Sequence, residues 1–334
     1  MIETRYEPIS GPGLSNFSFP EGTALIAIGD VHGQASTLRS LCQSIADLDL
    51  GGLRRHVVFL GDAIDRGPAS VETMEIVYNE LGDLTNADEV TLLPGNHELL
   101  MADAIDEARA GNVTVQAGLL WLMNGGVRVL AEALKEDSLA TDILDDATRL
   151  MALAQRPADI KAAILPMAPL MGDFISGFRS VLHDRGIDPI QWIRSMPSHV
   201  RVGDVLCVHA GVDPKLSLEA ALNTPQNEHV SVRDHWAWVR EPFLANQHGW
   251  YEGGIRNTTG GERGAGVLVV HGHTVPNKWG AHPSTDPERI DRVFCRMKTN
   301  SRICVDFGSG VGVGVGACLI TSQGRKLLFQ PCEM

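Results

Sequence analysis

Residues 24–34 read Ala-Leu-Ile-Ala-Ile-Gly-Asp-Val-His-Gly-Gln, and this stretch decides the fold. The apolar run predicts a buried strand that ends at the Gly-Asp turn, and residues 35–48 after it have a helical pattern. The turn therefore lies at the C-terminal end of a strand, where open α/β sheets place their chemistry. Asp30 and His32 offer a carboxylate and an imidazole there, which are suitable ligands for a divalent transition metal. A turn aspartate that bonds its own backbone explains Asp30 equally well, so this stretch alone is a weak signal.

Composition limits the classes of partner. A chain of 334 residues with 44% apolar residues can form one large domain or two ordinary ones. The net charge is −13, from 28 Lys and Arg against 41 Asp and Glu, so we expect no nucleic-acid partner. An anionic substrate would need a local positive centre, such as bound metal ions, to overcome this field.

Compartment is inferred from the cysteines and from the absence of targeting patterns. Six cysteines are spread through the chain without a Cys-x-x-Cys pair, and Cys207, Cys304 and Cys318 fall in apolar runs typical of buried, reduced thiols. No secretory signal pattern and no run of membrane-spanning length occurs. We expect a cytoplasmic protein with no membrane partner.

Four further apolar runs end in side chains of the same chemical kinds. They are 56–60 before Asp62, Asp65 and Arg66; 90–94 before Asn96 and His97; 205–208 before His209; and 267–270 before His271 and His273. Each of these residues alone has an ordinary explanation as a cap, a turn residue or a core histidine. Five such strand ends together predict a clustered metal site.

The number of ligands indicates how many ions are bound. The six candidates are Asp30, His32, Asp62, Asn96, His209 and His273. One tetrahedral site would use four at most, whereas six mixed oxygen and imidazole ligands suit two ions bridged by one carboxylate, for which we expect Asp62. Two ions about 3.5–4 Å apart clamp a phosphoryl group and generate hydroxide near neutral pH.

The remaining segments are assigned by pattern. Residues 1–22 predict an irregular N-terminal arm, and residues 23–334 a single domain with a helical insertion at about 99–198. A helix is expected over 70–81, capped by Ser70 and stopped by Gly82. The Gly-Val-rich residues 308–316 are either a loop or a glycine-weakened strand.

The combined motifs resemble the calcineurin-like metallophosphoesterases, and within them the phosphoprotein phosphatase family with its bacterial, lambda-phosphatase-like and ApaH-like serine/threonine phosphatase relatives. The matching motifs are GDVHGQ (29–34), GDAIDRG (61–67), GNHE (95–98), VHAGVDP (208–214), WVREPFL (238–244), VVHGHT (269–274) and RICVDFG (302–308). Trp121 with Asn124-Gly125-Gly126 is similar to a stretch of the bacterial members. The resemblance covers about residues 24 to 322 and implies an α/β fold, a two-sheet β-sandwich flanked by helices, with the insertion as a helical cap.

The resemblance also implies roles for the site residues. Asp30, His32 and Asp62 would hold the first metal ion, and Asp62, Asn96, His209 and His273 the second. His97 would be the general acid, and Asp65 would orient it and raise its basicity. Arg66 and Arg240 would grip the phosphate oxygens. A structural turn arginine remains an alternative for Arg66, and a structural role in a helix-like run is a stronger alternative for Arg240.

The implied function is hydrolysis of phosphomonoesters, either phosphorylated Ser/Thr in proteins or small phosphoesters. It would proceed by in-line attack of metal-bound hydroxide without a covalent phosphoenzyme, and no Cys-x5-Arg loop or P-loop competes with this interpretation. The cofactors would be two divalent ions, with Mn²⁺ favoured and Fe, Zn or Ni as alternatives. A dinucleoside polyphosphate (diadenosine tetraphosphate) hydrolase and a non-catalytic metal-binding scaffold remain alternative functions.

Overall fold

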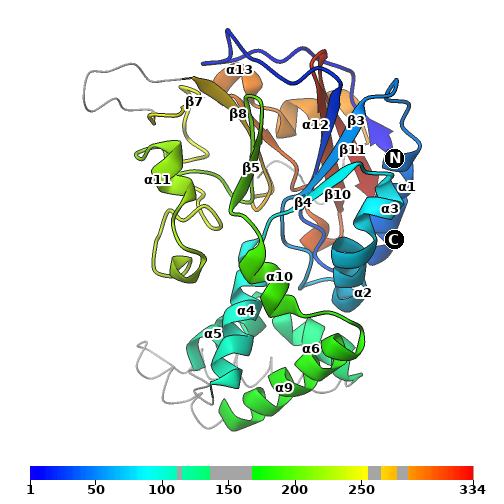
Figure 1. Cartoon of the computed structure of the whole chain (residues 1–334), viewed down its shortest axis with the longest axis vertical. Helices are drawn as coiled ribbons and strands as arrows, with labels where there is room; N and C mark the ends of the chain where they lie inside the picture. The colour runs from blue at the N-terminus through cyan, green and yellow to red at the C-terminus, as the bar shows by residue number, and fades with distance from the viewer. Residues whose placement is uncertain (111–114, 136–167, 255–264, 277–284, 334) are drawn as a thin grey trace.

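The computed structural model of the chain describes residues 1–110, 115–135, 168–254, 265–276 and 285–333. Two sheets lie together in the upper part of Figure 1, and a group of helices lies below them. The predicted fold class, a two-sheet α/β sandwich flanked by helices, is confirmed by this arrangement. Among the described residues, no helix is both long enough and apolar enough to cross a bilayer.

The first sheet is six-stranded and mixed, in the order β1-β11-β10-β2-β3-β4. Its strands are β1 (Ile2–Glu3), β2 (Thr23–Ile28), β3 (Arg54–Phe59), β4 (Glu89–Leu92), β10 (Gly314–Thr321) and β11 (Gly324–Pro331). β2, β3 and β4 run parallel, whereas β10 and β11 are antiparallel to their neighbours. The arm of residues 1–22 is mainly irregular, but it supplies the edge strand β1, which pairs with β11.

The second sheet places β6 and β8 at its centre. Its strands are β5 (His199–Val202), β6 (Val205–Val208), β7 (Trp250–Tyr251), β8 (Gly266–His271) and β9 (Arg302–Cys304). β8 runs parallel to both β6 and β9. The Gly-Val-rich residues 308–316 include both expected forms, because a short 3₁₀ turn (Ser309–Val311) precedes the start of β10.

β2 is apolar after Thr23 because both of its faces are buried. Leu25 and Ala27 belong to the core cluster that contains Cys207 of the second sheet. Ile26 on the opposite face belongs to the cluster that contains Leu38 of helix α1 (Ala35–Ala46). A strand buried on both faces has a continuous apolar sequence rather than an alternating one. The run at 24–28 therefore marks the middle layer of the molecule.

The helix expected over 70–81 is longer than predicted. It comprises α2 (Ser70–Glu75), a π-helical turn (Ile76–Glu80) and α3 (Leu81–Thr85), so Gly82 does not end it. The helix ends at Asn86, which has a left-handed conformation with φ 51°. After the insertion, the structure also describes the short helices α11 (Leu218–Leu222), α12 (Pro287–Phe294) and α13 (Met297–Asn300).

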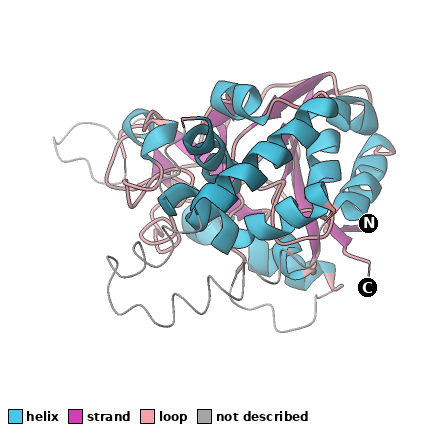
Figure 2. Ribbon diagram, turned by 90° about the horizontal axis from the view of Figure 1, so that it is seen from below, coloured by secondary structure: helices cyan, strands magenta, loops and turns pink. Residues whose placement is uncertain are grey.

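All regular elements that the structure describes between Asn96 and Ser198 are helical. They are α4 (Asn96–Arg109), α5 (Val115–Trp121), the π-helical turn Leu122–Gly126, α6 (Val127–Leu134), α9 (Ala168–Asp184) and α10 (Pro189–Ser195). Residues 111–114 and 136–167 of the expected insertion lie outside the described residues. Figure 2, seen from below, shows helices in front of the strands on this side of the molecule.

The helical insertion is joined to the sandwich by a side-chain cap. Ser70 is not the N-cap of α2 as expected, because Ala69 occupies that position and makes no side-chain cap. The Glu132 carboxylate of α6 instead accepts hydrogen bonds from the backbone N–H groups of Ser70 (2.6 Å) and Val71 (3.0 Å). A negative charge at a helix N-terminus satisfies free donors and also interacts favourably with the helix dipole.

We expect Glu132→Ala to lower the free energy of unfolding by about 1–3 kcal/mol, because it leaves two donors of α2 without an acceptor. Glu132→Gln keeps an acceptor but loses the charge, so its loss should be smaller. Denaturant unfolding followed by circular dichroism measures both. Glu72→Ala is the control, because its ion pair with Arg39 is about half-exposed and contributes less than about 1 kcal/mol. Equal stability of Glu132→Ala and the parent chain would contradict the capping role.

Candidate metal centre

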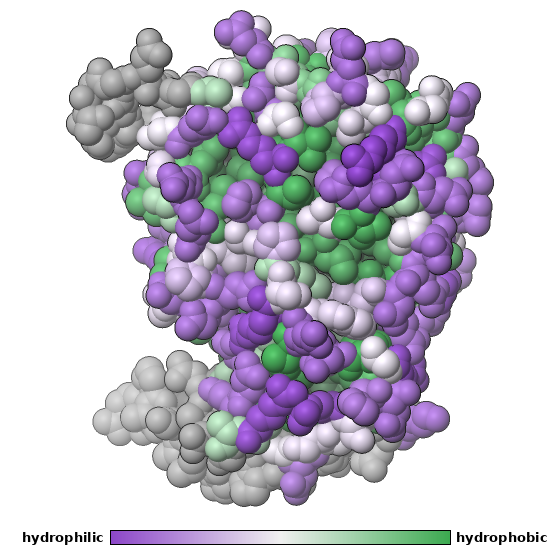
Figure 3. Space-filling view, viewed as in Figure 1, coloured by the Kyte–Doolittle hydropathy of each residue, from purple (hydrophilic) through white to green (hydrophobic). Residues whose placement is uncertain are grey.

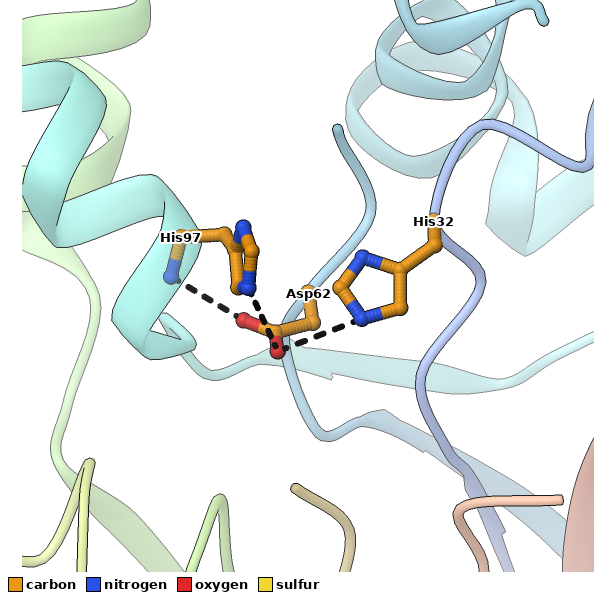
Figure 4. A group of neighbouring side chains, drawn as sticks. All are labelled: His32, Asp62 and His97. Carbon is orange, nitrogen blue, oxygen red and sulfur yellow. Dashed lines mark hydrogen bonds and ion pairs between the residues drawn. The ribbon is translucent and has the colours of Figure 1, made fainter. Parts of the chain in front are cut away.

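The carboxyl ends of the parallel strands bring the predicted side chains together around Asp62. Asp62 Oδ2 lies 3.7 Å from His32 Nε2, 3.5 Å from His209 Nε2 and 3.9 Å from His97 Nε2. Figure 4 shows His32 and His97 on either side of this carboxylate. Asp62 thus belongs to two groups of residues that could hold a metal ion, one with His32 and His97 and the other with His209 and His273. It is the central residue of the site.

Backbone contacts hold the two main turns against each other. The N–H groups of Val31 and His32 both donate to the Asp62 carbonyl oxygen, at 3.0 and 2.9 Å. Glu98 fixes the second turn, because its carboxylate accepts from the N–H groups of Asp62 (2.7 Å) and Ala63 (2.8 Å). Glu98 therefore has a structural part in the GNHE motif, consistent with its near-complete burial at 1% exposure.

Several site residues have backbone conformations that residues other than glycine rarely adopt. Positive φ angles occur at His32 (48°), Asp62 (59°), Asp65 (72°), Arg66 (67°) and His273 (64°). Each such residue costs of order 1 kcal/mol, and strained residues of this kind cluster at functional sites. Because they are not glycines, nothing in the sequence marked them as strained.

The tautomer of His209 leaves a lone pair directed at other acceptors. Its Nδ1–H donates to the Leu60 carbonyl oxygen at 2.8 Å, and burial lowers the pKa of His209 to about 3. The ring is therefore neutral, and Nε2 carries a lone pair. That lone pair faces Asn96 Oδ1 at 3.1 Å and Asp62 Oδ2 at 3.5 Å, and both oxygens are acceptors when Asp62 is ionised. A cation among these three atoms would satisfy all of them.

His32 repeats this arrangement on the other side of Asp62. Its Nδ1–H donates to the Ile64 carbonyl oxygen at 2.8 Å, and burial, reinforced by Arg66, lowers the pKa of His32 to about 3. The lone pair on Nε2 lies 4.0 Å from Asp30 Oδ2 and accepts a hydrogen bond from Arg66 Nη1 at 3.0 Å. Burial, followed by repulsion from Asp306, raises the pKa of Asp30 well above its usual value, so the ionised form of Asp30 would be stabilised by a cation.

His273 joins the second sheet to the site. Its backbone N–H donates to Asp30 Oδ1 at 3.0 Å, and its Nδ1 lies 2.8 Å from Asn96 Oδ1. Its buried Nε2 has no hydrogen-bond partner among the described residues. Divalent transition metals prefer as ligands buried nitrogen and oxygen atoms that carry a lone pair and no proton. The residues present therefore fit a site for divalent cations.

His97 and Asp65 form a buried pair beside this ligand set. His97 Nδ1–H donates to Asp65 Oδ2 at 2.5 Å, and His97 Nε2 accepts from Arg66 Nη2 at 2.9 Å. The pKa of His97 is well below its ordinary value, first because of burial and then because of His32 and Arg66. Desolvation of the imidazolium thus dominates the pKa of His97, and the expectation that Asp65 raises the basicity of this ring stays a prediction.

Asp65 has a second hydrogen-bond partner, Trp121, for which the sequence predicted no role. Trp121 Nε1–H, at the end of α5, donates to Asp65 Oδ1 at 3.1 Å. Burial and the nearby Glu98 raise the pKa of Asp65, and the Trp121 hydrogen bond opposes this by favouring the ionised carboxylate. The stretch from Trp121 to Gly126 was the available signal, but its pattern alone did not indicate what the indole contacts.

The two predicted arginines differ in their surroundings. Arg66 is exposed, and its guanidinium spans the two imidazoles of His32 and His97. Arg240 is also exposed and lies in a turn region rather than a helix, and its charge lowers the pKa of both His209 and His273. Cationic groups therefore lie beside both halves of the ligand set.

Polar residues predominate on the face of the molecule shown in Figure 3, with apolar patches between them.

Two neighbouring groups fall outside the ligand set. His271 Nε2 accepts from Arg302 Nη1 at 2.9 Å, and its Nδ1–H donates to the Gly272 carbonyl oxygen at 2.9 Å. Asp306 accepts from the Gly308 N–H at 3.0 Å, and burial raises its pKa to about 6. His271 supports the turn that carries His273, whereas Asp306 supports the turn of residues 306–308.

Curated relatives match only part of this chain. A bis(5'-nucleosyl)-tetraphosphatase (asymmetrical) of Geobacillus sp. (strain WCH70) is 35% identical over 75 residues, which cover 21% of this chain and 29% of that protein. The catalytic subunit of serine/threonine-protein phosphatase 6 of Caenorhabditis elegans is 36% identical over 81 residues, which cover 24% of this chain and 22% of that protein. The matched region thus spans less than a third of either relative.

Solved structures match over most of the chain at low identity. A cold-active protein-tyrosine phosphatase of a psychrophilic Shewanella species has a TM-score of 0.44 and 17% identity, covering 92% of this chain and 80% of that one. A metallophosphoesterase from Sphaerobacter thermophilus has a TM-score of 0.39 and 13% identity, covering 93% and 88%. The family model described as calcineurin-like phosphoesterase matches residues 24–297, a span that contains all of the ligand turns. The chain therefore belongs to the calcineurin-like phosphoesterase family.

Proposed function

We propose that this chain is a metal-dependent phosphatase that hydrolyses phosphomonoesters, either phosphorylated Ser/Thr in proteins or small phosphoesters. One observation carries the proposal: buried imidazole nitrogens and acceptor oxygens gather around Asp62, next to two exposed arginines, one of which donates to His32 Nε2. Such an arrangement binds cations and, through them and the arginines, a phosphate group. Membership of the phosphoesterase family supports the same reaction class.

The chain's own residues would hold two divalent ions. Asp30, His32 and Asp62 would hold one, and Asp62, Asn96, His209 and His273 the other. When bound, such ions supply positive charge to a phosphoryl group and lower the pKa of water toward neutrality. The mixed nitrogen and oxygen ligands suit Mn²⁺, which we propose first, and Fe, Zn and Ni are the alternatives.

Arg66, Arg240 and His97 would act on the substrate itself. The exposed guanidinium groups of Arg66 and Arg240 would donate to phosphate oxygens, because a planar guanidinium matches two oxygens at once. His97 would deliver a proton from Nε2 to the leaving oxygen, while Asp65 holds Nδ1–H and so directs Nε2 into the site. The negative charge of bound phosphate would favour protonation of His97 and oppose the effect of burial.

A dinucleoside polyphosphate hydrolase is the second candidate, and the similarity to a bis(5'-nucleosyl)-tetraphosphatase favours it. In that reaction the same residues would act on a phosphoanhydride instead of an ester. A metal-binding scaffold without turnover is the third candidate.

We further propose that the helical insertion of residues 99–198 restricts access to the site as a cap. Two sets of hydrogen bonds support this proposal. Trp121 donates to Asp65, and Glu132 caps α2 next to the turn of residues 61–67. We also propose a cytoplasmic location, because all six cysteines are free thiols and four of them are buried.

An activity panel tests these functions together. With added Mn²⁺, we expect hydrolysis of p-nitrophenyl phosphate and of phosphoserine peptides to exceed hydrolysis of diadenosine tetraphosphate. Faster turnover of the tetraphosphate would favour the second candidate. No turnover of any substrate by chain that retains bound metal would favour the scaffold.

Removal of the proposed acid should depend on the leaving group. We expect His97→Asn to lose roughly 10²–10⁴-fold in kcat on phosphoserine peptides, whose alkoxide must be protonated, and less on p-nitrophenyl phosphate. His183→Asn is the control, because that side chain is 86% exposed on α9. Steady-state kinetics measures both, and equal losses on the two substrates would contradict the acid assignment.

Removal of the shared carboxylate should affect both ions. We expect Asp62→Ala to reduce bound metal from two ions per chain to one or none, because Asp62 adjoins both halves of the ligand set. Asp30→Ala should retain more metal, because Asp30 Oδ2 lies beside the His32 imidazole and meets the second half only through the backbone N–H of His273. Elemental analysis after dialysis measures the ions, and two full equivalents in Asp62→Ala would refute the shared role.

A further inference from the structure

The second oxygen of Asp65 is occupied by a residue of the helical insertion. Asp65 is fully buried, and its carboxylate has one strong donor on each oxygen: His97 Nδ1–H on Oδ2 at 2.5 Å and Trp121 Nε1–H on Oδ1 at 3.1 Å. A carboxylate held at both oxygens cannot rotate about its Cβ–Cγ bond without breaking one of these hydrogen bonds. The plane of the Asp65 carboxylate, and with it the direction of the His97 ring, therefore depends on Trp121.

The indole is itself held in place from both sides. Phe178 of α9 packs against it with ring centroids 5.6 Å apart. Gly126 leaves room for the ring, because a Cβ atom at this position would overlap the indole atoms. Gly125, with φ 124°, lies against the Asp65 side chain and the Arg66 backbone, where a side chain would also overlap. The two glycines thus let the end of α5 approach the turn of residues 65–66.

We propose that Trp121 is a positioning residue for the reaction, which holds Asp65 so that His97 Nε2 points into the metal centre. The proposal rests on the proposed phosphatase function and extends it, because it gives the helical insertion a part in the chemistry as well as in access. It also explains the stretch Trp121 to Gly126: the tryptophan supplies the N–H donor, and the glycines allow the approach.

A purely structural role for Trp121 is the rival explanation, since the side chain is fully buried against Phe178. The two roles differ in what they do to leaving groups. Loss of packing would lower the turnover of every ester by a similar factor. Misdirection of the acid would slow esters with poor leaving groups far more than those that leave unprotonated.

The test compares Trp121→Phe, which keeps an aromatic ring but removes the N–H, with Phe178→Leu, which loosens the packing but keeps the hydrogen bond. Kinetics with phenyl phosphate and p-nitrophenyl phosphate, metal content and thermal unfolding are measured for each. We expect Trp121→Phe to lower kcat on phenyl phosphate by about 10- to 100-fold, with a much smaller loss on p-nitrophenyl phosphate. Phe178→Leu should lower Tm while the ratio of the two rates stays at the parent value.

Two further variants make the outcome independent of a single substitution. Trp121→His keeps a ring N–H and should recover part of the rate ratio, whereas Gly126→Ala pushes on the indole and should reproduce the Trp121→Phe ratio. An unchanged ratio in both Trp121→Phe and Gly126→Ala, with an active parent chain, would overturn the positioning role alone. A parent chain that hydrolyses neither ester would overturn the proposed function and this inference together.

Discussion

The structure depends on the burial of the Asp62 carboxylate among neutral imidazoles and other oxygen acceptors. Asp62 Oδ2 faces the Nε2 atoms of His32 and His209, and each of these rings donates its one N–H, at Nδ1, to a backbone carbonyl group. Acceptors buried against acceptors are costly unless a cation satisfies them. The fold therefore gathers acceptor lone pairs at one point, where the Arg66 guanidinium donates to His32 Nε2, and this arrangement suits metal ions and phosphate.

The rest of the sandwich keeps this unfavourable arrangement in place. Strained left-handed residues, including Asp62 and Arg66, persist because the surroundings determine their positions more than once. Glu98 binds the backbone at Asp62 and Ala63, and the Asp62 carbonyl oxygen in turn accepts two hydrogen bonds from the first turn. The parallel strands that carry these turns are buried on both faces, so their ends cannot separate without opening the core.

The helical insertion is coupled to the site by polar contacts as well as by packing. Glu132 of α6 caps α2, the helix that begins three residues after Gly67, and Trp121 of α5 completes the partners of Asp65. Both contacts are buried or half-buried. Glu132 accepts from two backbone N–H groups of α2, and Trp121 donates to the Asp65 oxygen that His97 does not contact. The helical insertion thus takes part in holding the residues beside the candidate metal ligands.

The sequence by itself determined the strands that lead into the candidate site, the order of their polar endings and the types of candidate ligand, because hydrophobic periodicity and turn residues are local properties of the chain. It did not predict β1, β5 or β7. It did not reveal the tautomers of His32 and His209, the lowered pKa of His97 or the continuation of the helix through Gly82 to Thr85. Those features depend on burial and on neighbours that the local pattern does not contain. The contacts of Trp121 with Asp65 and of Glu132 with Ser70 join residues 56 and 62 positions apart. Only the tertiary structure decided them, because a hydrogen bond between distant segments exists only once the packing of those segments has set its donor and acceptor in line.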